Sequence, residues 1–125
     1  MTTTRDQVRQ WARTAARAAW AKGGDDTVVI EVGEVLAITD AFVITSGRNS
    51  RQVKTIAEEV EERLKTEGEI KPLRVEGLGD SQWVLLDYGD LVIHVFLDET
   101  RAFYDLERLW SDAPRVAWED EAARN

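Results

Sequence analysis

The chain has 125 residues, of which 43% are hydrophobic and 8% aromatic, and this composition suits one globular domain with a single core. Its 16 Lys and Arg side chains against 24 Asp and Glu give a net charge of −8, which argues against binding dominated by nucleic-acid phosphates, direct DNA binding included. Because the chain has no cysteine and one histidine, disulfides, thiolate catalysis and His- or Cys-rich zinc sites are excluded.

The first predicted element is a helix that starts at the capping-box sequence Thr4-Arg5-Asp6-Gln7 and ends at Gly23-Gly24. Its apolar face comprises Val8, Trp11, Ala12, Ala15 and Ala19. Trp20 points to the other side, which carries three arginines. Two interpretations stay open: arginine stems cover Trp20, or Trp20 anchors an interface, such as that of a homodimer.

Two β-branched runs, residues 27–32 and 41–46, predict strands. The segment Ser46–Ser50 then opens a second helix that ends at Gly68. Its core face comprises Val53, Ile56, Ala57, Val60 and Leu64. A strand followed by SGRNS and a helix could bind an anion through free N–H groups. The chain has no Walker A or GxGxxG motif, so the interpretation of Asn49 and Gln52 as a cap pair is favoured.

The second half of the chain predicts a short strand at 72–77, a hairpin at 82–97 and a third helix capped by Asp98 or Thr100. The expected apolar side of that helix comprises Ala102, Phe103, Leu106, Leu109 and Trp110. This order predicts an α/β fold, a mixed sheet of about five strands flanked by helices. We expect one domain over residues 1–113 and an acidic, flexible tail over 114–125.

The hairpin carries the most informative surface. If Tyr88-Gly89 forms a two-residue loop, Asp87 faces Asp90. In the same register Leu85 faces Val92 and Trp83 faces His94. The core face then comprises Val84, Leu86, Leu91, Ile93 and Val95, and the opposite face comprises Trp83, Leu85, Asp87, Asp90, Val92, His94 and Phe96.

Two facing carboxylates repel, so Asp87 and Asp90 admit three interpretations. A divalent cation could lie between them, a basic partner could neutralise them, or they form a solvated turn in which repulsion is screened. The neighbouring apolar side chains favour a contact surface. For His94 the commoner role is structural, stacked on Trp83 or hydrogen-bonded to a neighbour.

At this point the chain resembles a known family, the ribosomal silencing factors, also called the Iojap family. The likeness runs from about Thr27 to Trp110. Its most specific positions are Thr39-Asp40, Thr45-Ser46-Gly47, Ser50-Arg51, Val75-Glu76-Gly77, Trp83, Asp87, Gly89-Asp90, His94-Val95, Tyr104, Leu106-Glu107 and Leu109-Trp110. The resemblance implies a nucleotidyltransferase-like α/β fold without demonstrated transferase activity.

The resemblance also implies binding to the large ribosomal subunit through its protein number fourteen, at the intersubunit face. Such a factor blocks joining of the small subunit and represses translation when nutrients are scarce. We expect the contact on the hairpin face, at Trp83, Leu85, Asp87, Tyr88, Asp90, Val92 and His94, extended by Arg101 and Tyr104. A cytoplasmic protein that forms a homodimer when free fits this function, and no apolar run approaches a membrane span.

A magnesium-dependent nucleotidyltransferase or another nucleotide-binding enzyme is the alternative. Catalysis in that fold needs a Gly-Ser turn and carboxylates that alternate on one strand to hold the metal. Here Ser46-Gly47 is reversed, and Asp87 and Asp90 straddle a turn. The sequence therefore favours a binding protein with no catalytic residues, metal or cofactor.

Overall fold

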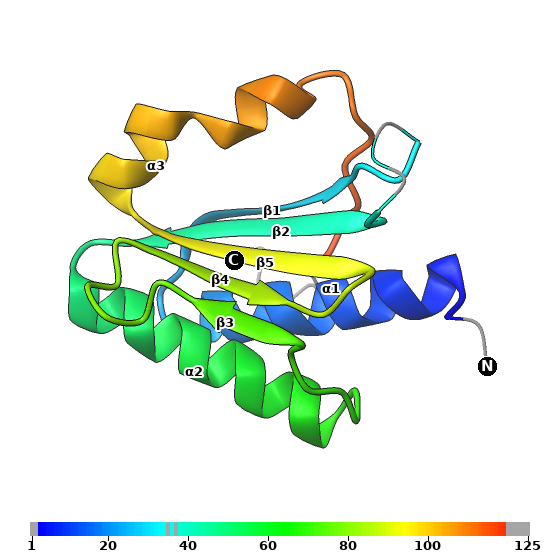
Figure 1. The fold of residues 1–125 in the computed structure, drawn as a ribbon, viewed down its shortest axis with the longest axis horizontal. Helices are drawn as coiled ribbons and strands as arrows, with labels where there is room; N and C mark the ends of the chain where they lie inside the picture. The colour runs from blue at the N-terminus through cyan, green and yellow to red at the C-terminus, as the bar shows by residue number, and fades with distance from the viewer. Residues whose placement is uncertain (1–2, 35, 37, 120–125) are drawn as a thin grey trace.

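The structure is a computed structural model that describes residues 3–34, 36 and 38–119. A five-stranded mixed sheet lies between two helical layers (Figure 1). The elements in chain order are α1 (Arg5–Ala21), β1 (Asp25–Glu31), β2 (Ala41–Gly47), α2 (Ser50–Thr66), β3 (Arg74–Glu76), β4 (Trp83–Asp87), β5 (Leu91–Leu97), α3 (Asp98–Tyr104) and the 3-10 helix η1 (Leu106–Trp110). The predicted fold class is confirmed.

The sheet has the strand order β1-β2-β5-β4-β3. The central pair, β2 and β5, is parallel, and all other neighbours are antiparallel. β5 is therefore enclosed by strands on both sides and by helices on both faces. This position explains why Leu91, Ile93 and Val95 are fully buried on one face while His94 and Phe96 are buried on the other.

The helices α1 and α2 lie side by side under one face of the sheet (Figure 1). Both begin at the predicted caps: Thr4 Oγ1 accepts from the Gln7 N–H at 3.1 Å, and Asn49 Oδ1 accepts from the Gln52 N–H at 2.8 Å. Their predicted apolar faces supply the larger core. Within the described part of the chain, no helix is both long and apolar enough to cross a membrane.

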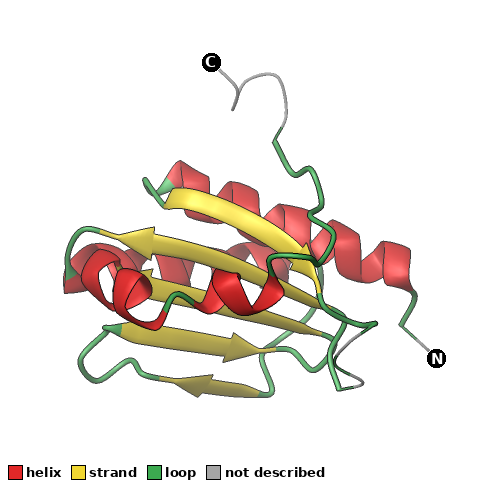
Figure 2. Ribbon diagram, turned by 90° about the horizontal axis from the view of Figure 1, so that it is seen from above, coloured by secondary structure: helices red, strands yellow, loops and turns green. Residues whose placement is uncertain are grey.

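The layer on the other face is formed by α3 and η1 (Figure 2). It covers a smaller core of Ile30, Val32, Phe42, Ile44 and Phe96. The prediction of one continuous third helix to Trp110 is wrong, because Asp105 adopts a left-handed conformation (φ 47°) and separates the two short helices. The predicted apolar side is confirmed only in part. Leu106 and Trp110 pack on the core, whereas Ala102, Phe103 and Leu109 are exposed.

The expected domain end at residue 113 does not hold, because residues 114–119 pack on the domain. The Glu31 N–H donates to the Pro114 carbonyl at 2.9 Å and the Val116 N–H to the Val29 carbonyl at 3.0 Å, so this segment runs along the free edge of β1. Trp118 is buried and its indole N–H donates to the Thr27 carbonyl at 2.9 Å. The sequence pattern missed this because a single tryptophan carries no periodicity. The rest of the expected tail, 120–125, lies outside the described residues.

Candidate docking surface

The β4–β5 hairpin has the predicted faces but a different register. Asp87 faces Val92, Leu85 faces His94 and Trp83 faces Phe96. The Tyr88 N–H donates to the Leu91 carbonyl at 2.8 Å, so the two loop residues are Gly89 and Asp90. Gly89 has φ +88°, and it occupies the first loop position, where a type II′ turn requires glycine. The loop lies one residue later in the chain than predicted, so each strand residue faces a partner two residues further along. A shift of two keeps every strand side chain on its predicted face.

This register overturns the pairing of Asp87 with Asp90. Asp87 instead lies opposite Arg74 of β3, with Arg74 Nη2 3.0 Å from Asp87 Oδ2. Its other oxygen accepts from the Gly89 N–H at 2.8 Å. The hydrogen bond that Arg74 donates to Asp87, and then the negative charge of Asp87, raise the pKa of Arg74. Asp90 is a turn residue whose carbonyl accepts from the Asp40 N–H at 2.9 Å.

Aromatic rings gather on the hairpin face away from α1 and α2. The ring centroid of Trp83 lies 4.7 Å from that of Phe96 and 5.0 Å from that of Tyr104. The ring of Phe42 lies 4.8 Å from that of His94. Tyr104 is 55% exposed, so the cluster reaches the surface where α3 ends.

One ring nitrogen of His94 makes the structural hydrogen bond that the sequence favours. The Trp83 indole N–H donates to His94 Nδ1 at 3.1 Å. An indole nitrogen only donates, so Nδ1 is an acceptor and the neutral ring carries its proton on Nε2. Burial lowers the pKa of His94 to about 4. The imidazole is therefore neutral at physiological pH.

A groove of about 390 Å³ opens beside the hairpin. We call it the hairpin groove, and it is lined by Leu36, Ile38, Thr39, Phe42, Leu73, Arg74, Leu85, Asp87, Gly89, Val92 and His94. Four of the predicted contact residues meet there, namely Leu85, Asp87, Val92 and His94. The opposite wall, including Ile38 and Leu73, was missed by the sequence analysis. Thr39 could have been found, because Thr39-Asp40 is one of the positions shared with the ribosomal silencing factors. Leu73 and Arg74 could not, because the sequence does not indicate which strand the three-residue strand β3 pairs with.

Two predicted contact residues lie elsewhere. Tyr88 packs on the larger core, on the α1 and α2 side of the sheet, and burial there, with the charge of Glu61, raises the pKa of its hydroxyl. Arg101 is buried rather than exposed. Its guanidinium bonds Glu107, the carbonyls of Asp25 and Asp26, and Ser46 Oγ. It holds α3 to the ends of β1 and β2, away from the hairpin groove.

Trp20 is 46% exposed on α1. The arginines beside it bond other groups: Arg13 and Arg17 donate to the Ala117 and Trp118 carbonyls, and Arg9 to Glu31. Their guanidinium groups are thus fixed by the C-terminal segment and by β1. The part of Trp20 in an interface stays a prediction.

The SGRNS turn contains the predicted cap. Besides the Asn49 bond, Gln52 Oε1 accepts from the Arg48 N–H at 2.7 Å, and Gln52 Nε2 donates to the Lys22 and Gly23 carbonyls at 3.2 Å. Ser46, the residue of the reversed Gly-Ser pattern, bonds Arg101 at 3.0 Å. Across residues 3–34, 36 and 38–119, no group of three or more His, Asp or Glu could hold a metal ion.

The fold and this surface define a class of protein: a small three-layer α/β domain with an apolar groove and, among its described residues, no cluster of three or more His, Asp or Glu that could hold a metal ion. Residues 5–125 match the model of the family RsfS, described as ribosomal silencing factor during starvation. The chain belongs to this family.

Two relatives and one solved structure are consistent with this family assignment. The chain is 41% identical over 106 residues to the ribosomal silencing factor RsfS of Halalkalibacterium halodurans, covering 84% of this chain and 89% of that one. It is 32% identical to the chloroplastic protein Iojap of Zea mays, over 85% of this chain and 46% of that one. A crystal structure of a Chromobacterium violaceum protein, 31% identical, superposes with a TM-score of 0.79 and covers 83% of this chain and 86% of that chain.

Proposed function

We propose that this protein binds the large ribosomal subunit through ribosomal protein number fourteen at the intersubunit face. There it obstructs joining of the small subunit and represses translation under nutrient limitation. The family assignment supports a ribosomal silencing role. A mouse relative, 35% identical over 69% of this chain and 39% of its own length, is named for mitochondrial assembly of the ribosomal large subunit. In this proposal the protein acts on free ribosomal subunits in the cytoplasm.

The observation that carries the proposal is the surface around the hairpin groove. It combines exposed apolar side chains, Ile38 at 82% and Leu73 at 72%, with the Asp87 carboxylate. Small clusters of exposed apolar groups beside charges are typical of contact surfaces. The net charge of −8 matches a basic ribosomal protein as partner and opposes direct phosphate binding.

The free protein forms a homodimer in this proposal, and Trp20 is the anchor we assign to its interface. A half-exposed tryptophan on a rigid helix is a common interface residue. Because Trp20 lies on α1 and the hairpin groove lies on the opposite face of the sheet, the two surfaces are separate.

The proposed function is binding and not nucleotidyl transfer. The catalytic pattern needs a Gly-Ser turn, whereas this chain has Ser46-Gly47, and the Ser46 hydroxyl accepts a hydrogen bond from the buried Arg101. Asp87 is bonded to Arg74 and the hairpin turn. If magnesium and nucleotide together raise the melting temperature, the protein has a ligand site that this account lacks.

Sedimentation with separated ribosomal subunits through a sucrose gradient tests the proposal. We expect co-migration with the large subunit and none with the small subunit. A protein that stays at the top of the gradient in both tubes, at low salt and at physiological salt, would refute it.

A further inference from the structure

The structure points to a specific use of the hairpin groove, and this inference rests on the proposed function. We propose that the groove receives one large apolar side chain from a basic segment of a ribosomal protein, with the adjoining main-chain amide bonded to Thr39 and His94. The partner is thus a protein that presents an apolar anchor flanked by cations, and not ribosomal RNA.

The walls of the groove supply the apolar part. Leu36, Leu85, Val92 and Phe42 line it, and Ile38 and Leu73 stand at the surface. Its volume of about 390 Å³ lies within the range of roughly 300–1,000 Å³ that is typical of sites that bury a ligand. Fully burying one large apolar side chain is the kind of contact that dominates protein interfaces.

Two residues that line the groove carry buried polar atoms without partners, and these atoms point to a ligand. His94 and Thr39 are 5% and 6% exposed, and both line the groove. Among the described residues, neither His94 Nε2 nor Thr39 Oγ1 has a hydrogen-bond partner. Buried polar groups without partners cost free energy and are uncommon. A main-chain amide would offer a carbonyl acceptor to the Nε2 proton and an N–H donor to the Thr39 hydroxyl.

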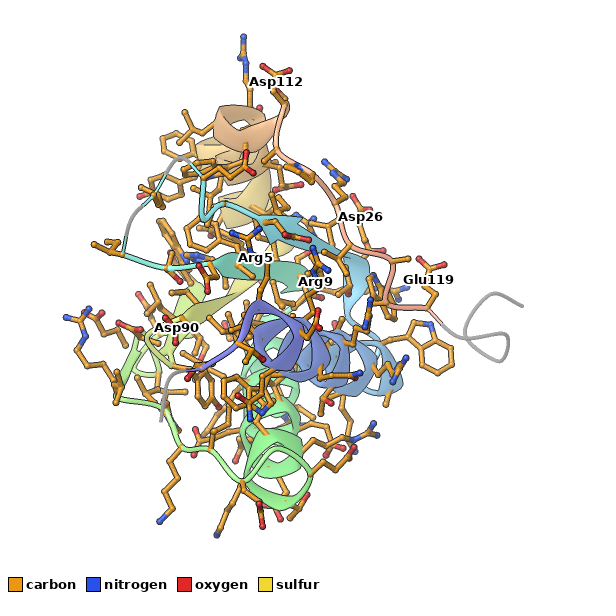
Figure 3. All side chains as sticks on the ribbon, turned by 90° about the vertical axis from the view of Figure 1, so that its right-hand side faces the viewer. Arg5, Arg9, Asp26, Asp90, Asp112 and Glu119 are labelled. Atoms are coloured by element: carbon orange, nitrogen blue, oxygen red, sulfur yellow. The ribbon has the colours of Figure 1, made fainter. Side chains whose placement is uncertain are left out.

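Charge comes from the groove lining and from residues next to it in sequence. Asp87 lines the groove, and Asp40 and Asp90, which are not in the lining, directly follow the lining residues Thr39 and Gly89. Arg74 is the guanidinium that lines the groove beside them. Figure 3 faces this end of the molecule and shows Asp90 at the hairpin turn. Arg74 is 67% exposed and Asp87 18% exposed, and Asp87 also accepts from the Gly89 N–H, so a partner cation would share the Asp87 carboxylate with Arg74 in its present position.

One double polar variant and a matched control test the apolar contacts of the groove. Ile38→Gln with Leu73→Gln removes the exposed apolar rim without adding charge, and both side chains are already solvated, so the fold should not change. Leu109→Gln is the control, because Leu109 is 75% exposed on η1, outside the groove. We expect the double variant to bind purified large subunits at least tenfold more weakly, and the control to bind within twofold of wild type.

Thr39→Val tests the polar part, because it keeps the shape and removes the unpaired hydroxyl. We expect binding to weaken several-fold while the melting temperature stays the same or rises. Unchanged affinity of Thr39→Val would remove Thr39 from the proposal, and wild-type affinity of the double variant would overturn the groove itself. In either case wild-type co-migration with the large subunit would leave the proposed function standing, whereas loss of wild-type co-migration would refute that function first.

The class of partner is tested by crosslinking. The chain has no cysteine, so Ile38→Cys carries a single maleimide-linked benzophenone, and Leu109→Cys serves as control. Irradiation with large subunits should link position 38 to a ribosomal protein, with a far lower yield from position 109. Crosslinks from position 38 to ribosomal RNA alone would overturn the protein partner.

Discussion

At the scale of single residues, two buried side chains of opposite character sit on the same layer of the molecule. His94 is neutral, held by the Trp83 indole and packed against Phe42. Arg101 is charged, and it bonds Glu107 together with two main-chain carbonyls. Both lie between the sheet and the layer of α3 and η1. Their environments lead to two different predictions.

The low pKa of His94 predicts that acid destabilises the fold. An unfolded histidine has a pKa near 6.5, whereas that of His94 is about 4 in the folded protein, so the unfolded state binds more protons between these values. The free energy of unfolding should therefore fall as pH drops from about 6.5 to 4, by up to about 3 kcal/mol from this group. Urea unfolding at several pH values measures it. His94→Asn keeps an acceptor near Nδ1 and should flatten this slope, and an equal slope in the variant would contradict the assignment.

Arg101 predicts a large effect from an apolar replacement of similar length. Arg101→Met leaves Glu107 and the Asp25 and Asp26 carbonyls without their donor, and we expect it to destabilise the fold by about 3 kcal/mol. Arg108→Met, at an exposed position on η1, should change stability by less than about 0.5 kcal/mol. Similar losses in the two variants, measured by urea unfolding, would show that Arg101 has no special role.

At the scale of elements, the sequence predicted what local chemistry determines. The caps Thr4 and Asn49 and the helical periodicity located α1 and α2, and β-branched runs located β1 and β2. The hairpin faces were correct because they depend only on alternation. Its register was wrong because glycine serves either loop position, depending on the turn type. The register decides which residue opposes Asp87, and the expected acidic pair was lost with it.

The remaining errors concern contacts between distant segments. The break at Asp105 lies between Arg101 and Glu107, which are bonded across the kink. Arg101 also bonds the start of β1, 75 and 76 residues away in sequence, and Ser46 of β2, 55 residues away. The packing of Trp118 depends on a carbonyl of β1 and on arginines of α1. Nothing in either local sequence reveals these partners. Only the hairpin wall of the groove was predicted. The other wall comes from β3 with the residue before it and from the loop before β2, which are distant in sequence from the hairpin face.

The C-terminal segment predicts a strong effect at one tryptophan and a weak effect at another. Trp118→Ala removes a side chain that is 7% exposed and its bond to Thr27, and should destabilise the fold by about 3–5 kcal/mol. Trp20→Ala, at 46% exposure, should cost less than about 1 kcal/mol in the monomer. Chemical unfolding at low protein concentration measures both. A stable Trp118→Ala variant would show that residues 114–119 are dispensable for the fold.

At the scale of the whole molecule, the helices α1 and α2 cover one face of the sheet from β1 to β4 and leave β3 exposed, and α3 with η1 cover only part of the other face (Figures 1 and 2). The C-terminal segment closes the edge at β1. The hairpin groove is thus left at the β3–β4 side, where no helix or strand of the described residues covers it. A domain with an uncovered apolar groove and a net charge of −8 is suited to obstruct a surface by occupying it.

Subunit joining is the measurement that tests this account most directly. Purified large subunits are incubated with the protein, small subunits are added at a magnesium concentration that favours whole ribosomes, and the products are separated on a gradient. The account predicts fewer whole ribosomes as the protein concentration rises, with the protein in the large-subunit peak, and less inhibition by the double variant Ile38→Gln with Leu73→Gln. Undiminished joining while the protein occupies the large subunit would contradict it.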